Sequence, residues 1–283
     1  MSELTYGQTL KTGTTRLTEA GIEYAREEAR AFLVWVCDIS TIDLISLEHA
    51  PFPDEHAQAY HDTIERRASG EPLQHIVGQT VFYGIPLKTD PRALIPRSDS
   101  ECVVELALEY LPTSAPAQIA DLGTGTCALL IALLTARTKL TGIAVEQNAD
   151  AANLAAENIQ ATGLSTRTEL FKGNWTDWTG WATTDLIISN PPYIASSVIP
   201  TLAPEVRDHD PMDALDGGVD GLDAYREIIT MARDMKPGAH LVLEIGYDQK
   251  TAVTALLIAA NFSNIAHRKD LGGNDRAIAA TAP

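Results

Sequence analysis

Apolar positions recur with a helical period in the first quarter of the chain. Between residue 2 and about residue 70 they return at steps of three and four, which places them on one face of an α-helix. The clearest run is Ile22, Ala25, Ala29, Phe32, Leu33 and Val36. Breaks are expected near Thr12-Gly13, over residues 38–41 and at residues 51–53. The pattern predicts a small helical bundle over residues 1–74, either a stabilising cap or a docking domain for a macromolecular substrate.

The period of the pattern shifts between residues 71 and 97. Residues 75–83 and 85–89 have β-like patterns and are separated by Gly84, which predicts a β-hairpin. We expect residues 75–96 to form a hairpin linker, followed by a helix over residues 102–110. Ser98 or Asp99 is expected to cap that helix.

Strands and helices alternate from residue 117 onward. Strands are expected at residues 118–122, 140–145, 167–172, 185–189 and 240–245, near residue 265, and at residues 277–280. This alternation is typical of a mostly parallel sheet with helices on both faces. The predicted fold class is therefore α/β, with a Rossmann-like domain over residues 97–283.

The formal net charge of −17 at pH 7 narrows the choice of partners. A nucleic-acid-binding surface carries a basic face that releases counterions, whereas adjacent basic residues occur here only at positions 66–67 and 268–269. No apolar run approaches the roughly 20 residues that span a bilayer. Residues 1–6 lack the pattern of a signal peptide, and the three cysteines have neither disulfide nor zinc spacing. We expect a cytoplasmic protein with no direct nucleic-acid or membrane partner.

A glycine-rich turn follows the first strand of the alternating region. Asp121-Leu-Gly-Thr-Gly-Thr-Cys127 leads into an expected helix over residues 128–136, and its glycines let the main chain approach a ligand closely. Glu146 ends the next strand about 25 residues after Asp121, where an α/β fold places a carboxylate for ribose hydroxyls. A dinucleotide-binding dehydrogenase uses similar parts, so this turn alone leaves that alternative open.

A second polar segment, Asn190-Pro191-Pro192-Tyr193, follows the apolar strand at residues 185–189. Proline cannot donate to a sheet and restricts the preceding residue to extended conformations, so Asn190 is expected at the strand's carboxyl edge. The side-chain oxygen of Asn190 and the main-chain oxygen of Pro191 form a pair of acceptors that suits a planar NH2 group. Hydride transfer has no evident use for such a pair, whereas methyl transfer to nitrogen does.

With these segments assembled, the chain resembles the release-factor glutamine methyltransferases, a family of class I S-adenosylmethionine-dependent methyltransferases. The similarity runs over most of the length. The segments that carry it are residues 70–75, 95–101, 121–126, 190–193, 214–218, 220–223 and 243–246. The resemblance implies a Rossmann-like sheet and methyl transfer to the glutamine side-chain amide in the Gly-Gly-Gln motif of peptide-chain release factors.

The resemblance also implies site residues. For S-adenosylmethionine they are Gly123, Thr124, Gly125, Thr126, Cys127, Glu146, Asn174, Trp175 and Asn190. For the substrate glutamine they are Asn190, Pro191, Pro192 and Tyr193, with Asn190 and Pro191 as the catalytic acceptors. Three residues depart from the common family pattern: Cys127 replaces a third glycine and could crowd the cofactor, Glu146 replaces Asp, and Asn174 replaces Asp.

The acidic segment at residues 208–223 does not match a Ca²⁺ loop, and methyl transfer needs no metal, so we expect a solvated loop near the substrate and no metal site. Two other functions stay open. One is a nucleic-acid exocyclic-amine methyltransferase, which shares the glycine-rich turn and Asn-Pro-Pro-Tyr. The other is a non-catalytic binding module, for which Cys127 is the only support.

Overall fold

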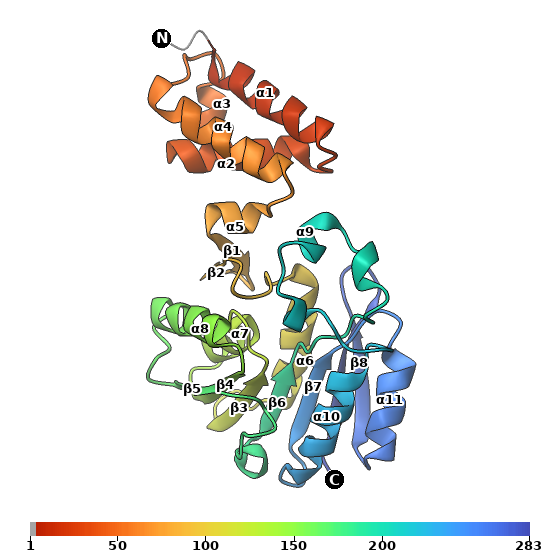
Figure 1. Cartoon of the computed structure of the whole chain (residues 1–283). Coiled ribbons are helices and arrows are strands. Elements are labelled where there is room, and N and C mark those ends of the chain that lie inside the picture. The colour runs from red at the N-terminus through yellow and green to blue at the C-terminus, as the bar shows by residue number, and fades with distance from the viewer. Residues whose placement is uncertain (1–3) are drawn as a thin grey trace. The chain divides into compact units, whose positions relative to one another are not determined.

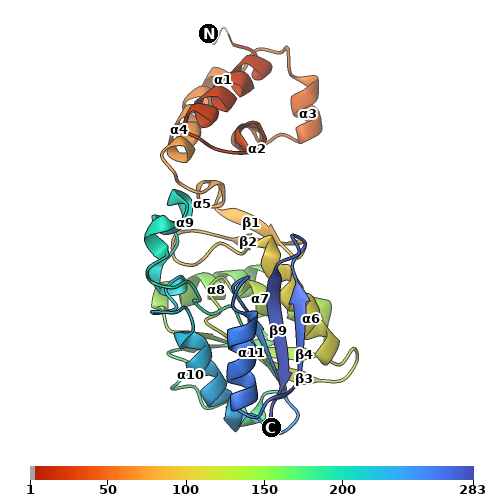
Figure 2. The same ribbon diagram turned by 90° about the vertical axis from the view of Figure 1, so that its right-hand side faces the viewer.

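The chain divides after Gly78 in a computed structural model that describes residues 4–283 (Figures 1 and 2). The first unit ends at Gly78 and the second spans Gln79–Pro283. Each unit has its own hydrophobic core. Within residues 4–283, no helix combines the length and the apolar character that a membrane span requires.

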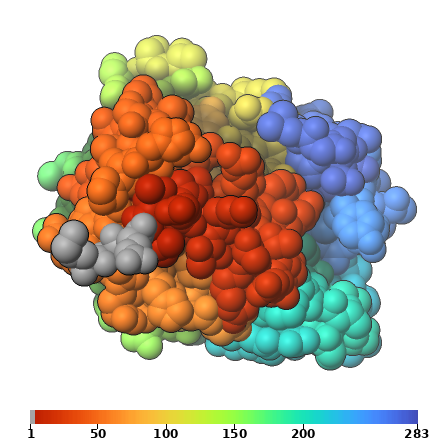
Figure 3. Space-filling view, turned by 90° about the horizontal axis from the view of Figure 1, so that it is seen from above, coloured from red at the N-terminus to blue at the C-terminus, as the bar shows by residue number. Residues whose placement is uncertain are grey.

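The first unit is helical, as predicted, and Figure 3 shows one face of it in red and orange. Its helices are α1 (Tyr6–Glu19), α2 (Ala25–Cys37), α3 (Thr41–Ser46), α4 (Asp54–Ala68) and α5 (Leu73–Val77). Thr5 with Gln8, and Ser40 with Asp43, form capping boxes that start α1 and α3. The helices enclose a core that includes Tyr6, Leu17, Phe32, Leu33, Tyr60 and Ile64.

The predicted breaks near residues 38–41 and 51–53 are confirmed, but the break at Thr12-Gly13 is wrong because α1 continues through both residues. Gly13 is buried, and a Cβ at this position would overlap the hydroxyl of Tyr60 on α4. The glycine therefore permits two helices to approach closely instead of ending one of them.

The hairpin is present as β1 (Gln79–Phe82) and β2 (Ile85–Lys88), paired antiparallel. The strand predicted to begin at residue 75 is wrong over its first part, because residues 75–77 are helical in α5. Gly78 ends that helix in the left-handed conformation, at φ +78°.

The predicted cap of the helix over residues 102–110 is also wrong. Ser98 and Asp99 lie in a 3₁₀ turn, and α6 (Glu101–Tyr110) begins without a side-chain cap.

The second unit is built on a seven-stranded sheet in the order β5-β4-β3-β6-β7-β9-β8. The strands are β3 (Ala117–Leu122), β4 (Leu140–Glu146), β5 (Thr168–Lys172), β6 (Leu186–Ser189), β7 (His240–Glu244), β8 (Ser263–Lys269) and β9 (Asp275–Thr281). Strands β3 to β7 pair with one another in parallel, whereas β9 is antiparallel to both β7 and β8. The predicted α/β class and all seven predicted strands are confirmed, with small shifts at their ends.

Helices cover both faces of this sheet (Figures 1 and 2). They are α6, α7 (Ala128–Ala136), α8 (Ala149–Ala161), α10 (Asp223–Met231) and α11 (Lys250–Ala259), whereas the short α9 (Pro204–Arg207) lies beyond the end of the sheet. Residues of α6, α7 and α8 share one core with Ile119 of β3, and residues of α10 and α11 share the other with Leu122 of β3. Side chains of one strand thus point alternately into the two cores, because successive residues of a strand face opposite sides of the sheet.

The order of the strands reverses at β3. Its next strand in the chain, β4, lies on one side, and β6 lies on the other. In open α/β sheets, ligands bind at the carboxyl ends of the strands that flank such a switch point. Leu122 pairs with Ser189, so the segments that begin at Gly123 and Asn190 leave the sheet side by side.

Asn158 on α8 connects the hairpin to the glycine-rich turn. Its side chain is buried, accepts a hydrogen bond from the Lys88 main-chain N–H at 2.8 Å, and donates to the main-chain oxygens of Lys88 at 3.1 Å and Thr126 at 3.0 Å. One amide thus satisfies polar main-chain groups of two segments that are far apart in the sequence.

We expect Asn158→Ala to lower the free energy of unfolding by about 2 kcal/mol, because it removes one buried hydrogen bond, to Thr126, and two partly buried ones, to Lys88. Urea unfolding followed by circular dichroism would measure the change. Asn153→Ala, on an exposed position of the same helix, is the matched control and should change stability by less than about 0.5 kcal/mol. Equal stability of the two variants would contradict the role given to Asn158.

Candidate active site

The turn after β3 bends its main chain around a pocket. Gly123 and Gly125 have φ values of +66° and +55°, in the left-handed region that favours glycine. The N–H groups of Gly123 and Thr124 donate to the main-chain oxygen of Val145 at 2.9 and 3.1 Å, which ties the turn to β4. A Cβ on Gly123 would lie 3.4 Å from the ring of Trp175. The absence of side chains at these two glycines therefore leaves the main chain open to a ligand.

Glu146 ends β4 and is nearly buried. Its Oε2 accepts a hydrogen bond from the Gly125 N–H and its Oε1 accepts one from the Asn148 N–H, both at 2.9 Å. Each carboxylate oxygen can accept a second hydrogen bond. Glu146 is thus fixed in place and still able to bind hydroxyl groups in the pocket.

Asp121 lies beneath the turn and is fully buried, with its Oδ2 accepting a hydrogen bond from the Thr124 hydroxyl at 2.6 Å. Burial raises the pKa of Asp121 to about 7, the hydrogen bond from Thr124 opposes that rise, and the neighbouring charge of Glu146 adds to it. The carboxyl therefore changes charge near neutral pH.

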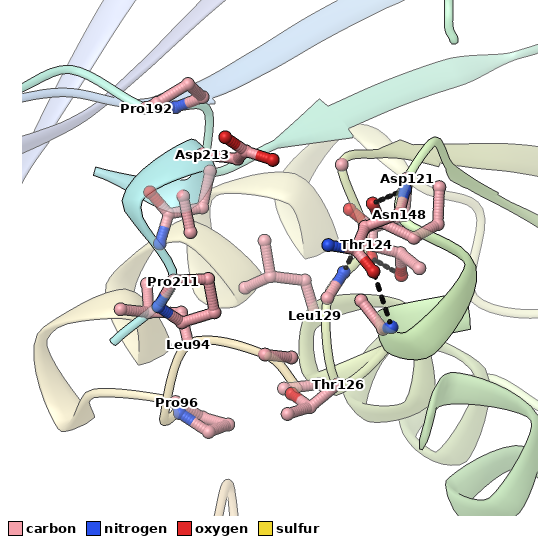
Figure 4. A pocket seen from close by; sticks show the side chains of 18 of the residues that line it. Leu94, Pro96, Asp121, Thr124, Thr126, Leu129, Asn148, Pro192, Pro211 and Asp213 are labelled. Atoms are coloured by element: carbon pink, nitrogen blue, oxygen red, sulfur yellow. Dashed lines mark hydrogen bonds between the residues drawn. The ribbon is translucent and has the colours of Figure 1, made fainter. Parts of the chain in front are cut away.

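One pocket brings most of the predicted cofactor residues together (Figure 4). Those that line it are Gly123, Thr124, Gly125, Thr126, Glu146, Trp175 and Asn190, together with Pro192. Figure 4 shows Asp121 and Thr124 on one side, with Leu94 and Pro211 across from them. The Trp175 indole N–H donates to Glu227 at 2.6 Å, which fixes the ring against the pocket wall.

Two predicted cofactor residues do not line this pocket. Cys127 is fully buried in the hydrophobic core, at φ +67°, where burial raises the pKa of its thiol. Its side chain therefore does not crowd the pocket. Asn174 uses its side-chain oxygen to accept hydrogen bonds from the main-chain N–H and the hydroxyl of Thr176, at 2.8 and 2.9 Å, and it donates to Gln147 at 2.9 Å. Gln147 does line the pocket.

Asn190 also lines a second, adjacent pocket with a volume of about 140 Å³. One water molecule needs roughly 10–15 Å³ of such a volume, so the pocket is large enough for an amino-acid side chain. Tyr193 and Glu244 line this pocket, and the Tyr193 hydroxyl donates to Glu244 Oε1 at 3.2 Å. Pro191 is not among the residues that line either pocket. Asn190 is thus positioned between two ligand-sized spaces.

The acidic segment at residues 208–223 is more ordered than the predicted solvated loop. Asp210 is buried and pairs with Arg97 at 2.9 Å, and Asp213 lines the first pocket. The main chain of Ile194 bonds to Leu215 and Gly217 at 3.0 and 2.8 Å, so the segment packs directly after Tyr193. The expectation of a solvated loop is therefore wrong for Asp210.

Among residues 4–283, no group of three or more His, Cys, Asp or Glu side chains could hold a metal ion.

Sequence reasoning missed several lining residues. They are Ala93, Leu94, Pro96, Leu129, Asn148, Pro211, Ala214 and Glu244. The only available signal was that residues 95–101, 214–218 and 243–246 belong to the segments of family resemblance, without an assigned role. Most of these side chains are apolar, and composition does not distinguish a pocket wall from a core.

The raised pKa of Asp121 predicts a pH-dependent stability. Its folded pKa, about 7, exceeds the unfolded value of about 3.9. The folded chain therefore binds more protons between these values, and stability falls as the pH rises through this window. Asp121→Asn removes the titration, so the variant should lose about 1–3 kcal/mol less stability than the wild type between pH 5 and pH 8.

Urea unfolding at the two pH values would measure this difference. Asp177→Asn, on an exposed position, is the control and should keep the wild-type dependence. The same dependence in Asp121→Asn and the wild type would rule out the titration of Asp121.

Comparison with known proteins adds independent information. Residues 8–78 match the PrmC N-terminal domain, and residues 101–204 match the methyltransferase small domain. The release factor glutamine methyltransferase of Caulobacter vibrioides is 38% identical over 93% of this chain and 91% of its own length. The protein of the same name from Agrobacterium fabrum is 39% identical over 93% and 92%.

Solved structures support the fold. A methyltransferase from Pyrococcus furiosus superimposes with a TM-score of 0.51 and 16% identity, covering 81% of this chain and 98% of its own. Because the curated relatives exceed 30% identity over nearly the whole length, the chain belongs to the release factor glutamine methyltransferase family.

Proposed function

We propose that the chain transfers a methyl group from S-adenosylmethionine to the side-chain amide nitrogen of the glutamine in the Gly-Gly-Gln motif of peptide-chain release factors. The membership of the family supports the reaction and the substrate class. The single structural observation that carries the proposal is that Asn190 lines two adjacent pockets at the switch point of the sheet.

The residues of the first pocket fit S-adenosylmethionine. Gly123 and Gly125 expose main chain to the pocket, and Glu146 retains free acceptor capacity for the ribose hydroxyls. Trp175 offers an aromatic wall beside the turn. In this assignment the cofactor is held by Gly123, Thr124, Gly125, Thr126, Glu146, Trp175 and Asn190. Asn174 contributes indirectly, by positioning Gln147 through a hydrogen bond. When bound, the cofactor supplies an electrophilic methyl group on a positively charged sulfur.

The second pocket is assigned to the substrate glutamine. Asn190 and Tyr193 line this pocket. In this assignment the side-chain oxygen of Asn190 accepts one N–H group of the substrate amide. The main-chain oxygen of the next residue, Pro191, which lines neither pocket, accepts the other. An amide nitrogen is a weak nucleophile because its lone pair is delocalised into the carbonyl group. Two fixed acceptors orient the nitrogen and stabilise the positive charge that develops on it, through positioning and preorganised dipoles.

We place this reaction in the cytoplasm, where release factors act on ribosomes. The described cysteines, Cys37, Cys102 and Cys127, are all free thiols, which accords with a reducing compartment. The helical first unit, which resembles the PrmC N-terminal domain, is the proposed docking domain for the release factor.

The role of Asn190 can be tested directly. We expect Asn190→Ala to lower kcat by about 100-fold or more, because one preorganised partner of the reacting group is lost, while S-adenosylmethionine still binds. Asn190→Asp keeps an acceptor but adds a charge, and its kcat should lie between those of the alanine variant and the wild type. Steady-state kinetics and calorimetric titration of the cofactor would measure both quantities. Asn153→Ala is the control, and near wild-type turnover by Asn190→Ala would exclude this mechanism.

The substrate can be tested with labelled S-adenosylmethionine. We expect label on a purified release factor, none on the same factor with its motif glutamine changed to alanine, and none on nucleic acid. Scintillation counting and mass spectrometry of the labelled peptide would locate the methyl group. Label on nucleic acid would instead support an exocyclic-amine methyltransferase. Cofactor binding without any transfer would support a non-catalytic binding module.

A further inference from the structure

A buried carboxyl group faces the proposed glutamine pocket. Glu244 ends β7, beside β6, and only 3% of the residue is exposed. It lines the same pocket as Asn190. Its Oε1 accepts the hydrogen bond from Tyr193, whereas Oε2 has no hydrogen-bond partner among residues 4–283. A buried polar atom without a partner is costly, and such atoms in native structures often serve a ligand or a reaction.

The surroundings of Glu244 allow it to gain and lose a proton near neutral pH. Burial raises the pKa of Glu244 to about 7, while Ser100, Arg276 and Tyr193 favour the ionised form and Asp99 opposes it. The other titratable neighbours are Cys102 and Tyr225. A carboxyl in this range can accept a proton and release it again within a catalytic cycle.

The proposed reaction needs such an acceptor. The amide nitrogen forms a bond to the methyl carbon, the bond between that carbon and sulfur breaks with its electron pair going to sulfur, and the nitrogen must lose one proton. The oxygens of Asn190 and Pro191 orient the N–H groups but belong to amides, which are too weakly basic to retain a proton. Tyr193 is neutral near pH 7, because burial raises the pKa of its hydroxyl.

Asp210 is the other carboxyl that lines this pocket. Its Oδ1 also lacks a hydrogen-bond partner among residues 4–283, and burial raises its pKa, but its Oδ2 forms an ion pair with Arg97 at 2.9 Å, which opposes protonation. Among the described residues Glu244 forms no ion pair. Its Oε1 is hydrogen-bonded to Tyr193, which belongs to the same segment as Asn190, while its Oε2 has no hydrogen-bond partner.

We propose that Glu244 is the proton acceptor of the reaction, taking the amide N–H proton on Oε2 directly or through one water molecule. This assignment rests on the proposed function and adds a residue to it. Glu244 then returns the proton to solvent before the next turnover, so no further reactant is required.

Glu244→Gln tests the assignment, because it preserves the shape and the acceptor for Tyr193 but removes the base. We expect kcat to fall by about 100-fold with KM within a factor of about two. In the wild type, kcat should rise with pH through an inflection near or below 7, and the variant should lose that inflection. Asp121 titrates in the same range, so the difference between the two profiles is the decisive readout.

Carbon-13 NMR with labelled glutamate gives a readout independent of activity. In the wild type without ligands, the resonance of one glutamate side-chain carboxyl should shift with pH around pH 7. That resonance should be missing from the spectrum of Glu244→Gln. Glu169→Gln, on an exposed position of β5, is the matched control and should keep wild-type kinetics and titration.

A second variant covers the case in which Glu244→Gln does not fold. Tyr193→Phe retains the carboxyl but removes a hydrogen bond that favours its ionised form, so the inflection in kcat should move to higher pH. An unmoved inflection would overturn the proposal.

The outcomes also separate this inference from the proposed function. No methyl transfer to a release factor by the wild type would overturn both. Wild-type transfer together with an unchanged kcat and pH profile in Glu244→Gln, or an effect on KM alone, would overturn only the role of Glu244.

Discussion

The pairing of β3 with β6 is the interaction on which the site depends. The register that sets Leu122 opposite Ser189 places the glycine-rich turn beside Asn190, and the Ser189 hydroxyl strengthens the pairing by donating to the Leu122 oxygen at 2.7 Å. Because the strand order reverses at β3, no crossover helix covers this edge. The next strand, β7, pairs with β6 and brings Glu244 to the same edge. If β6 slipped by one residue, its side chains would turn to the opposite face of the sheet.

Buried carboxyl groups give the site its electrostatic character. Asp121, Glu146, Asp210 and Glu244 are all nearly buried around the two pockets, in a chain that already carries a net charge of −17. Burial raises the pKa of Asp121, Asp210 and Glu244, and hydrogen bonds or a nearby arginine oppose that rise. A positively charged ligand gains more from such groups than it would from exposed acids, since water screens them less. This arrangement suits a sulfonium cofactor and explains why an acidic protein need not bind its ligands through basic residues.

Main-chain contacts fix the segment after Asn190. Gln249 donates to the main-chain oxygens of Tyr193 and Gly221, at 2.9 and 3.1 Å, and accepts from the Gly246 N–H at 3.0 Å. Gly217 lies so close that a Cβ would be 2.8 Å from the Tyr193 Cα. The acidic segment, the segment that contains Asn190 and Tyr193, and the end of β7 are therefore held together by the side-chain amide of Gln249 and a close glycine contact. Preorganised acceptors depend on this kind of support, because a small displacement weakens their alignment with the reacting group.

The sequence by itself determined the α/β class, the seven strands, the helical first unit and the two polar segments, because hydrophobic period and the conformations of glycine and proline are local properties. It misread Thr12-Gly13, where the glycine serves packing against Tyr60, and residues 75–77, whose short apolar run fits either a helix or a strand. Only the tertiary structure decided that Cys127 faces the core, that Asn190 lines two pockets, and that Leu94 and Pro211 share one pocket. It also decided that Glu244 is buried with a free oxygen. These properties depend on which distant segments meet across the sheet edge, and that information is not contained in any local stretch of the chain.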